Sequence, residues 1–242
     1  MSESGHDMDA AAHLEHAQST FTINVDTTII SLGVAAIMVG LAYRMSKNLE
    51  KGVPGRWQNL LESLVDFINQ TVSDNFKHEN KLLAPLALTI FAYVFCCNLL
   101  GELPLNLGLK PPPADLNMPL ALALCVFFIV HYYSVKQKGL RGYINEYLFH
   151  PFGKWLMPVN IMMKLIEEIA KPVSLSFRLF GNIFAGEVIF ILISMLIPWW
   201  LNWLPGVPWI TFHLLIAAIQ AFVFMILTIV YVSMAFETEA DH

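Results

Sequence analysis

Charged residues are scarce in this chain of 242 residues. Only 14% are Asp, Glu, Lys or Arg, whereas a soluble domain usually carries about 25%. Hydrophobic residues make up 56% of the chain, and the mean hydropathy is +0.57. Polar side chains are too few to cover a surface in water, so the sequence predicts an all-α integral membrane protein.

Several motifs are also missing. No G-x-x-x-x-G-K-S/T sequence occurs, so we expect no nucleotide-binding P-loop, and no basic face is available for nucleic acid. The tail before the first apolar run has no Lys or Arg, which argues against a cleavable signal peptide. Its His6, His13 and His16 indicate at most weak metal binding. We expect no cofactor and no metal.

Cysteine is rare as well. The three thiols fall inside apolar segments, where they read as small buried side chains. They are Cys96, Cys97 and Cys125. The sequence therefore predicts no disulfide.

Long uncharged stretches locate about five transmembrane helices, since a span needs about 20 residues. The stretch from 188 to 236 has no charged residue and is too long for one crossing. Prolines and tryptophans between Pro198 and Trp209 predict a hairpin turn at a membrane surface. The predicted spans are 27–43, 82–103, 116–135, 159–197 and 207–236, within one membrane domain over 27–242 that follows a tail of residues 1–26.

The last two predicted helices are longer than a membrane is thick. At about 1.5 Å per residue, the helix over 207–236 would be about 45 Å long, against a hydrocarbon core of about 30 Å. The helix over 159–197 is longer still, and Pro172 can kink it. We expect both helices to be strongly tilted, which would suit packing against a broad, curved surface.

The distribution of Lys and Arg predicts the orientation. Ten lie in the loops on one side of the predicted spans and one, Lys110, lies on the other. Positive charges collect in the cytoplasm, so the N-terminus is predicted to be periplasmic and the C-terminus cytoplasmic. Apolar residues at helical spacing between Trp57 and Val72 predict an amphipathic helix on the cytoplasmic surface.

Polar residues form a seam along the helix over 159–197, although charge at membrane depth is costly. Glu167 and Lys171 are spaced as an i,i+4 pair and could simply be solvated. Arg178 lies about two turns further on, has no acid near it in sequence, and therefore favours a functional role. The seam consists of Lys164, Glu167, Lys171, Ser174, Arg178 and Asn182.

Two further polar residues, His213 and Gln220, share a face of the helix over 207–236. An antiparallel hairpin would set Arg178 level with Gln220, and Glu187 level with His213. Alone, His213 could be a hydrogen-bonded packing residue, but beside Glu187 it could relay protons. His131 is interpreted as a packing residue. Haem ligation by His131 and His213 is an alternative that no further His or Cys pattern supports.

Four segments resemble the subunit a family of F-type ATP synthases, and the likeness runs from about Asn75 to the end. The most specific is Lys171-Pro-Val-Ser-Leu-Ser-Phe-Arg-Leu-Phe-Gly-Asn-Ile-Phe-Ala-Gly-Glu187. The others are Ala84-Pro-Leu-Ala-Leu-Thr-Ile-Phe91, Ala114-Asp-Leu-Asn117 and the last helix with His213 and Gln220–Tyr231. The Trp-rich hairpin and short C-terminal tail look like bacterial members.

The resemblance implies the proton-channel stator of the Fo sector, in a bacterial inner membrane and surrounded by lipid. Its partners would be the c-subunit ring, the b-subunit peripheral stalk and the rest of F1Fo. Two offset half-channels would pass protons to and from the ring carboxylates, with Arg178 as the fixed charge. The outer half-channel would use Asn182, Glu187, His213 and Gln220, and the cytoplasmic one Glu167, Lys171 and Ser174.

The same resemblance implies no independent catalytic site in this chain. It departs from the family pattern at Lys164, where some relatives carry an acid. A proton-coupled solute transporter is an alternative class, but it would predict paired repeats, and none is visible. Sodium coupling is an alternative within the family, although Glu187 and His213 suit protons better.

Overall fold

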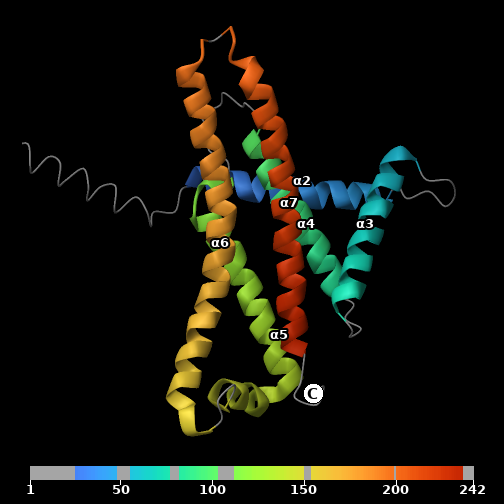
Figure 1. Ribbon diagram of the computed structural model, residues 1–242. Helices are drawn as coiled ribbons and strands as arrows, with labels where there is room; N and C mark the ends of the chain where they lie inside the picture. Colours follow the sequence, from blue (N-terminus) through green and yellow to red (C-terminus); the bar gives the residue numbers. More distant parts are fainter. Residues whose placement is uncertain are drawn as a thin grey trace, which may run out of the picture.

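The computed structural model describes residues 25–47, 55–76, 82–102, 112–149, 154–198 and 200–236 (Figure 1). All the regular structure in these ranges is helical. Five of the described helices are long and apolar enough to cross a membrane, which confirms the all-α fold class. The N-terminal tail with its three histidines, Lys110 and the last six residues lie outside the described ranges.

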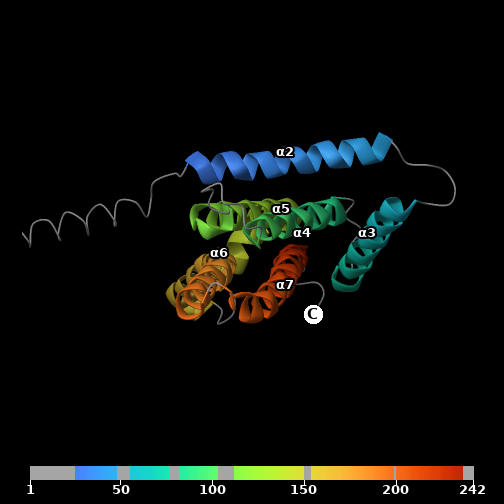
Figure 2. The same cartoon turned by 90° about the horizontal axis from the view of Figure 1, so that it is seen from above.

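The first two helices differ in how they meet the rest of the protein. Helix α2 (Val25–Lys47) is largely exposed and runs across the direction shared by α6 and α7 (Figures 1 and 2). Two polar contacts link α2 to the rest of the protein. Thr27 Oγ1 donates a hydrogen bond to Asp115 Oδ2 at 3.0 Å, and Ser31 hydrogen-bonds Tyr93. Helix α3 (Arg56–Asn75) is the predicted amphipathic helix, and it buries Ile68 against α4 and α7.

Helix α5 (Asn117–Phe149) extends well beyond the span predicted to end at residue 135. Gly139 has φ 69° and ψ 163°, which breaks the helical geometry. The part after Gly139 turns away and lies across the end of the molecule (Figure 1). This conformation is open to glycine alone among the residue types, so a single position ends the crossing and starts a lateral helix.

Helices α6 (Met157–Leu196) and α7 (Trp203–Phe236) form a long antiparallel hairpin (Figure 1). With 40 residues, α6 is about 60 Å long at 1.5 Å per residue, twice the hydrocarbon thickness. Both helices must therefore be tilted if they remain in the membrane. Helix α6 bends part-way along its length (Figure 1), and Pro172 removes one of its backbone hydrogen bonds.

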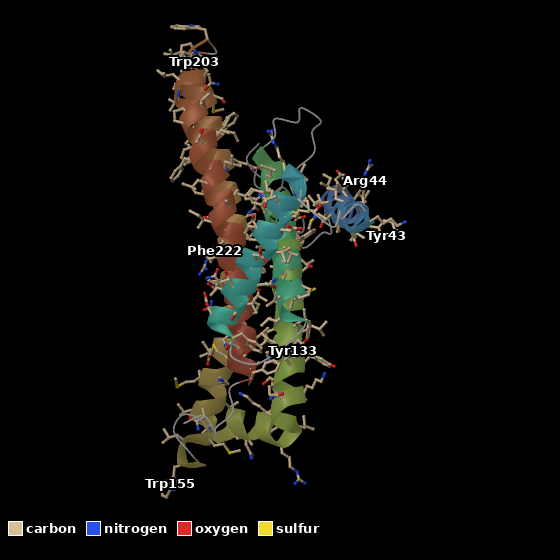
Figure 3. All side chains as sticks on the ribbon, turned by 90° about the vertical axis from the view of Figure 1, so that its right-hand side faces the viewer. Tyr43, Arg44, Tyr133, Trp155, Trp203 and Phe222 are labelled. Carbon is tan, nitrogen blue, oxygen red and sulfur yellow. The ribbon has the colours of Figure 1, made fainter. Side chains whose placement is uncertain are left out.

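One detail of the predicted hairpin turn was wrong. The structure begins α7 at Trp203, so the segment up to Trp209 is helical and does not belong to the turn. Pro205 is the third residue of α7, where the N–H group needs no intrahelical acceptor. Pro208 is the sixth residue and lies inside the helix, where it removes one backbone hydrogen bond. Trp155 and Trp203 lie at opposite ends of the molecule (Figure 3).

The core lies where α4 (Leu83–Glu102) packs between its neighbours. One apolar cluster joins α4 to α3 and α7, and the second joins α4 to α5, α6 and α7. The second cluster consists of Ile90, Val94, Ala123, Val126, Leu175, Leu179, Ala221 and Phe224. Of the three cysteines expected to be buried, Cys97 is buried, Cys96 is half-buried and Cys125 is exposed on α5. The thiol is weakly polar, so burial is not required for Cys125.

Candidate functional site

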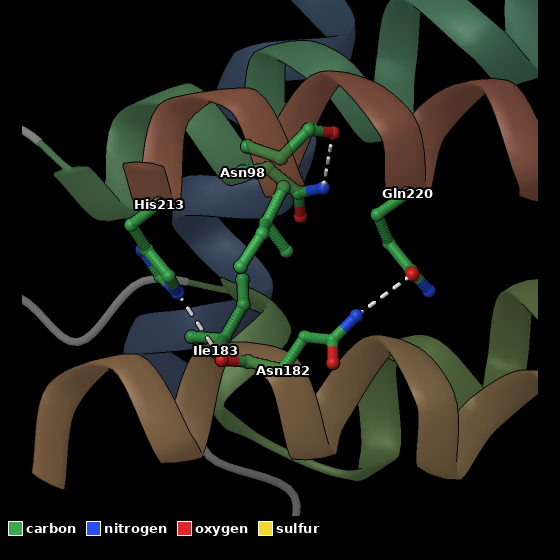
Figure 4. A pocket seen from close by; sticks show the side chains of 7 residues that line it. Asn98, Asn182, Ile183, His213 and Gln220 are labelled. Carbon is green, nitrogen blue, oxygen red and sulfur yellow. Dashed lines mark hydrogen bonds between the residues drawn. The ribbon is translucent and has the colours of Figure 1, made fainter. Parts of the chain in front are cut away.

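Polar side chains from α6 and α7 meet part-way along the hairpin (Figure 4). Asn182 Nδ2 donates a hydrogen bond to Gln220 Oε1 at 2.9 Å. His213 Nε2 lies 3.2 Å from the carbonyl oxygen of Asn182, and since a carbonyl only accepts, this ring nitrogen is the donor. His213 and Gln220 are buried. Asn182 thus joins both polar residues of α7 to α6.

Gly186 makes room for the imidazole. A Cβ atom added at Gly186 would lie 2.1 Å from His213 Nε2, far inside contact distance. Beside it, Trp209 Nε1 donates to the Gly186 carbonyl oxygen at 3.4 Å. Gly181 has no such role, because a Cβ atom there would meet nothing within 4 Å. The close approach of the two helices therefore depends on one glycine.

Asn98 of α4 completes the polar group and was not predicted from the sequence. Its Nδ2 donates to the carbonyl oxygen of Ala217 at 3.3 Å, while its Oδ1 is buried without a hydrogen-bond partner. Gln220 Nε2 is buried and unpartnered in the same way. Both residues line a cavity of about 10 Å³, room for roughly one water molecule, together with Asn182 and His213. A lone Asn within an uncharged span was the signal that could have found it.

The tight approach of Gly186 to His213 agrees with the expected register of the hairpin. Gln220 bonds to Asn182, one turn beyond Arg178, and the level placing of Arg178 with Gln220 stays a prediction. The contact of Glu187 with His213 stays a prediction. Glu187 is half-buried and directly follows Gly186, which the imidazole covers.

Arg178 lies on the exposed face of α6, near the middle of the helix. Among the described residues it has no hydrogen bond and no ion pair. On its own face lie Lys171, Ser174 and Asn182 of the polar seam, and a stripe of exposed apolar side chains runs beside that face: Val173, Phe177, Phe184 and Val188. Ser174 is exposed on the same part of the helix. A guanidinium exposed to lipid is costly, so this side of α6 suits a partner that carries negative charge.

The part of α6 before Arg178 holds an ionic cluster. The expected pair forms, with Lys171 Nζ 2.9 Å from Glu167 Oε1. Lys164 Nζ lies 3.6 Å from Glu167 Oε2. Lys171 also donates to Glu168 Oε1 at 3.2 Å and lies 5.7 Å from the ring centre of Tyr231. Glu168 was not among the residues predicted from the sequence, although it is spaced four residues from Lys164 and three from Lys171.

His131 is more than the packing residue that the sequence analysis expected. Its Nε2 lies 3.4 Å from Glu168 Oε2, so α5 and α6 are joined by an ionisable pair. The lone-residue interpretation failed because the partner lies on another helix, far along the chain. Within the described ranges, no group of three or more His, Cys, Asp and Glu residues is arranged to hold a metal ion.

Fold and site together define a multi-pass membrane protein with an internal polar site between its two longest helices. The chain matches the family model for the ATP synthase A chain over residues 27–233. It is 44% identical to ATP synthase subunit a of Alkalilimnicola ehrlichii, an alignment that covers 94% of this chain and 93% of the relative. It is 42% identical to that of Aeromonas salmonicida (95% and 93% covered) and 43% to that of Vibrio vulnificus (93% and 88%).

The chain therefore belongs to the ATP synthase A chain family. Membership places it in the proton-translocating membrane part of the ATP synthase, as a component of the larger complex.

Proposed function

We propose that this chain is the stator of proton flow in an F-type ATP synthase, with Arg178 as the fixed charge that couples protons to rotation. The observation that carries the proposal is the exposed guanidinium of Arg178, which has no hydrogen bond or ion pair among the described residues and lies beside a stripe of exposed apolar side chains on α6. Such a face fits the ring of c subunits, whose carboxylates would pass it in turn. The b-subunit stalk and the rest of F1Fo complete the assembly.

Arginine suits this task because its guanidinium stays protonated above pH 12 and cannot itself relay a proton. A carboxyl group on the ring that approaches Arg178 is driven to release its proton, because a nearby cation favours the ionised form. Away from Arg178, in lipid, the carboxylate takes up a proton again. The same fixed charge prevents a direct leak between the two half-channels.

The outer half-channel would run through the polar group between α6 and α7. Asn182, His213 and Gln220 are already linked by hydrogen bonds, and Glu187 adds a titratable carboxyl next to Gly186. The cytoplasmic half-channel would use Glu167 and Ser174, on the other side of Arg178 along α6. Each proton that crosses contributes about 2.3 kcal/mol per 100 mV of membrane potential.

The proposed orientation follows from the positive-inside rule, with the N-terminus periplasmic and the C-terminus cytoplasmic in a bacterial inner membrane. The hairpin turn between α6 and α7 would then be periplasmic. The part of α5 after Gly139, with Arg141, would lie on the cytoplasmic surface. The tail of residues 1–26 would be periplasmic, and residues 27–242 a single membrane domain.

Arg178→Ala tests the function in inverted membrane vesicles that contain the assembled complex. We expect ATP-driven acidification, followed with a pH-sensitive dye, to disappear while ATP hydrolysis by the assembled complex persists. The control is Arg44→Ala, which removes an exposed arginine at the end of α2 and should pump like the unsubstituted complex. Unchanged pumping by the Arg178 variant would overturn the proposal. Loss of pumping only when sodium is withdrawn would replace the proton by sodium.

A further inference from the structure

The contact between His131 and Glu168 joins α5 to α6 on the far side of Arg178 from the hairpin turn. The two atoms, His131 Nε2 and Glu168 Oε2, are 3.4 Å apart. Both side chains are largely covered, with 22% of His131 and 14% of Glu168 exposed. None of the half-channel residues named above is part of this contact.

The second ring nitrogen determines how many protons the contact holds. His131 Nδ1 lies 2.9 Å from the carbonyl oxygen of Phe127, and since a carbonyl only accepts, Nδ1 carries a hydrogen. In a neutral ring, Nε2 would then be a bare acceptor. An ionised Glu168 is also an acceptor only, so two lone pairs would face each other. A favourable contact needs one more proton, either on Nε2 or on the carboxyl group.

The charged groups around His131 and Glu168 are compatible with the presence or absence of this proton. On α6, Lys171 bridges Glu168 and Glu167, and Lys164 lies beside Glu167, so two ammonium groups balance two carboxylates. From the part of α5 after Gly139, the ring of Tyr143 lies 6.0 Å from that of His131. From α7, the Tyr231 ring lies near Lys171. The three charges outside the pair, Lys164, Lys171 and Glu167, sum to +1, so an ionised Glu168 is compensated whether or not the pair holds the extra proton.

The pair also lies between Arg178 and the lateral helix that follows Gly139. Lys171, which holds Glu168, precedes Arg178 by seven residues on the same face of α6, about 10 Å along the helix. In the other direction, Tyr143 belongs to the lateral helix that follows Gly139. Under the proposed orientation, that helix is at the cytoplasmic surface.

We propose that His131 and Glu168 form a proton-holding station of the cytoplasmic half-channel. The inference rests on the proposed function. An imidazole nitrogen that faces a carboxylate oxygen offers one proton two neighbouring positions, which suits the pair to pass a proton on. The station takes a proton from the cytoplasm, holds it between Nε2 and Oε2, and passes it toward the ring-facing side of α6. Its benefit is greatest when cytoplasmic protons are scarce.

The test uses Glu168→Gln and, from the opposite side of the contact, His131→Phe in the full complex. In inverted vesicles the cytoplasmic face meets the bath, so the bath sets its pH. We expect both variants to pump almost normally at pH 6.5 and about tenfold more slowly at pH 8.5, whereas unsubstituted complex slows far less. Added imidazole buffer, as a mobile proton carrier, should restore much of the rate. Glu62→Gln, exposed on α3, is the control.

Each outcome supports or overturns the proposed proton-holding station. Unchanged pH profiles would overturn the station, and so would equal losses at both pH values that imidazole does not restore, because a mere brace between α5 and α6 has that effect. If one variant does not assemble, the other carries the test, and the exchange His131→Glu with Glu168→His should regain the pH profile. Arg178→Ala is measured in parallel: pumping by that variant would reject the stator itself, whatever the station does.

Discussion

At the scale of single residues, the contact between Gly186 and His213 is the tightest constraint in the site. The imidazole occupies the space that any side chain at Gly186 would need. The ring is thereby held over α6, with its Nε2 at the carbonyl oxygen of Asn182. Glycine at this position makes room for a titratable group, so under the proposed function it would affect proton transfer through the position of His213.

Gly186→Ala should therefore impair pumping without preventing the helices from forming. The added methyl group would lie 2.1 Å from His213 Nε2, so the imidazole or the whole of α7 must move. Overpacking of this kind costs about 1–3 kcal/mol. We expect ATP-driven acidification in inverted vesicles to fall at least several-fold while the amount of assembled complex changes little.

Gly181→Ala is the matched control, since the same methyl group at that position meets nothing within 4 Å. It should pump like the unsubstituted complex. If the two alanine variants behave alike, the imidazole is not held in place by Gly186.

At the scale of helices, Gly139 decides where α5 stops crossing the membrane and becomes lateral. Its φ of 69° with ψ of 163° lies in a region that is almost closed to side chains. The change of direction also brings Tyr143 back toward His131, so this turn contributes to the proposed proton station.

Gly139→Ala should destabilise the complex by about 1–3 kcal/mol, the cost of a side chain in this conformation. No atom lies within 4 Å of the added methyl group, so the effect would be backbone strain alone. The measurement is the melting temperature of the detergent-solubilised complex. Gly40→Ala in α2 adds the same methyl group in open space at helical geometry and should leave the melting temperature unchanged or raise it. Equal melting temperatures for the two variants would contradict the strain at Gly139.

At the scale of the whole molecule, five crossings require that the two termini lie on opposite sides of the membrane. The turn between α6 and α7 and the lateral part of α5 should likewise be on opposite sides, the turn periplasmic and the lateral part cytoplasmic. Asn202 lies in the turn, and Lys138 immediately precedes Gly139.

Asn202→Cys should react with a membrane-impermeant maleimide in cells whose outer membrane is permeabilised, and Lys138→Cys only in inverted vesicles. The unsubstituted chain, with its cysteines inside apolar helices, gives the background. Reversed labelling would invert the orientation. Labelling of both positions from one side would contradict the number of crossings.

The extent of the helices could largely be read from the sequence, because apolar length and the cost of buried charge are properties of a continuous segment. The predicted span 159–197 corresponds to α6, Met157–Leu196, and the amphipathic pattern after Trp57 corresponds to α3. Misjudgements arose at turns. Pro205 suggested a break where α7 already begins, and Gly139 gave no sign that a helix continues beyond it.

The contacts of the site likewise divide into those along one helix, which the sequence predicts, and those between helices, which it does not. The spacing along α6 is enough to align Arg178 with Asn182 and to pair Glu167 with Lys171, since neighbours on one helix follow from its period. Contacts between helices depend on their rotation and offset, which small residues from distant segments set by packing. For that reason only the folded chain could bring Asn98 beside Gln220, seat His213 on Gly186, and join His131 to Glu168.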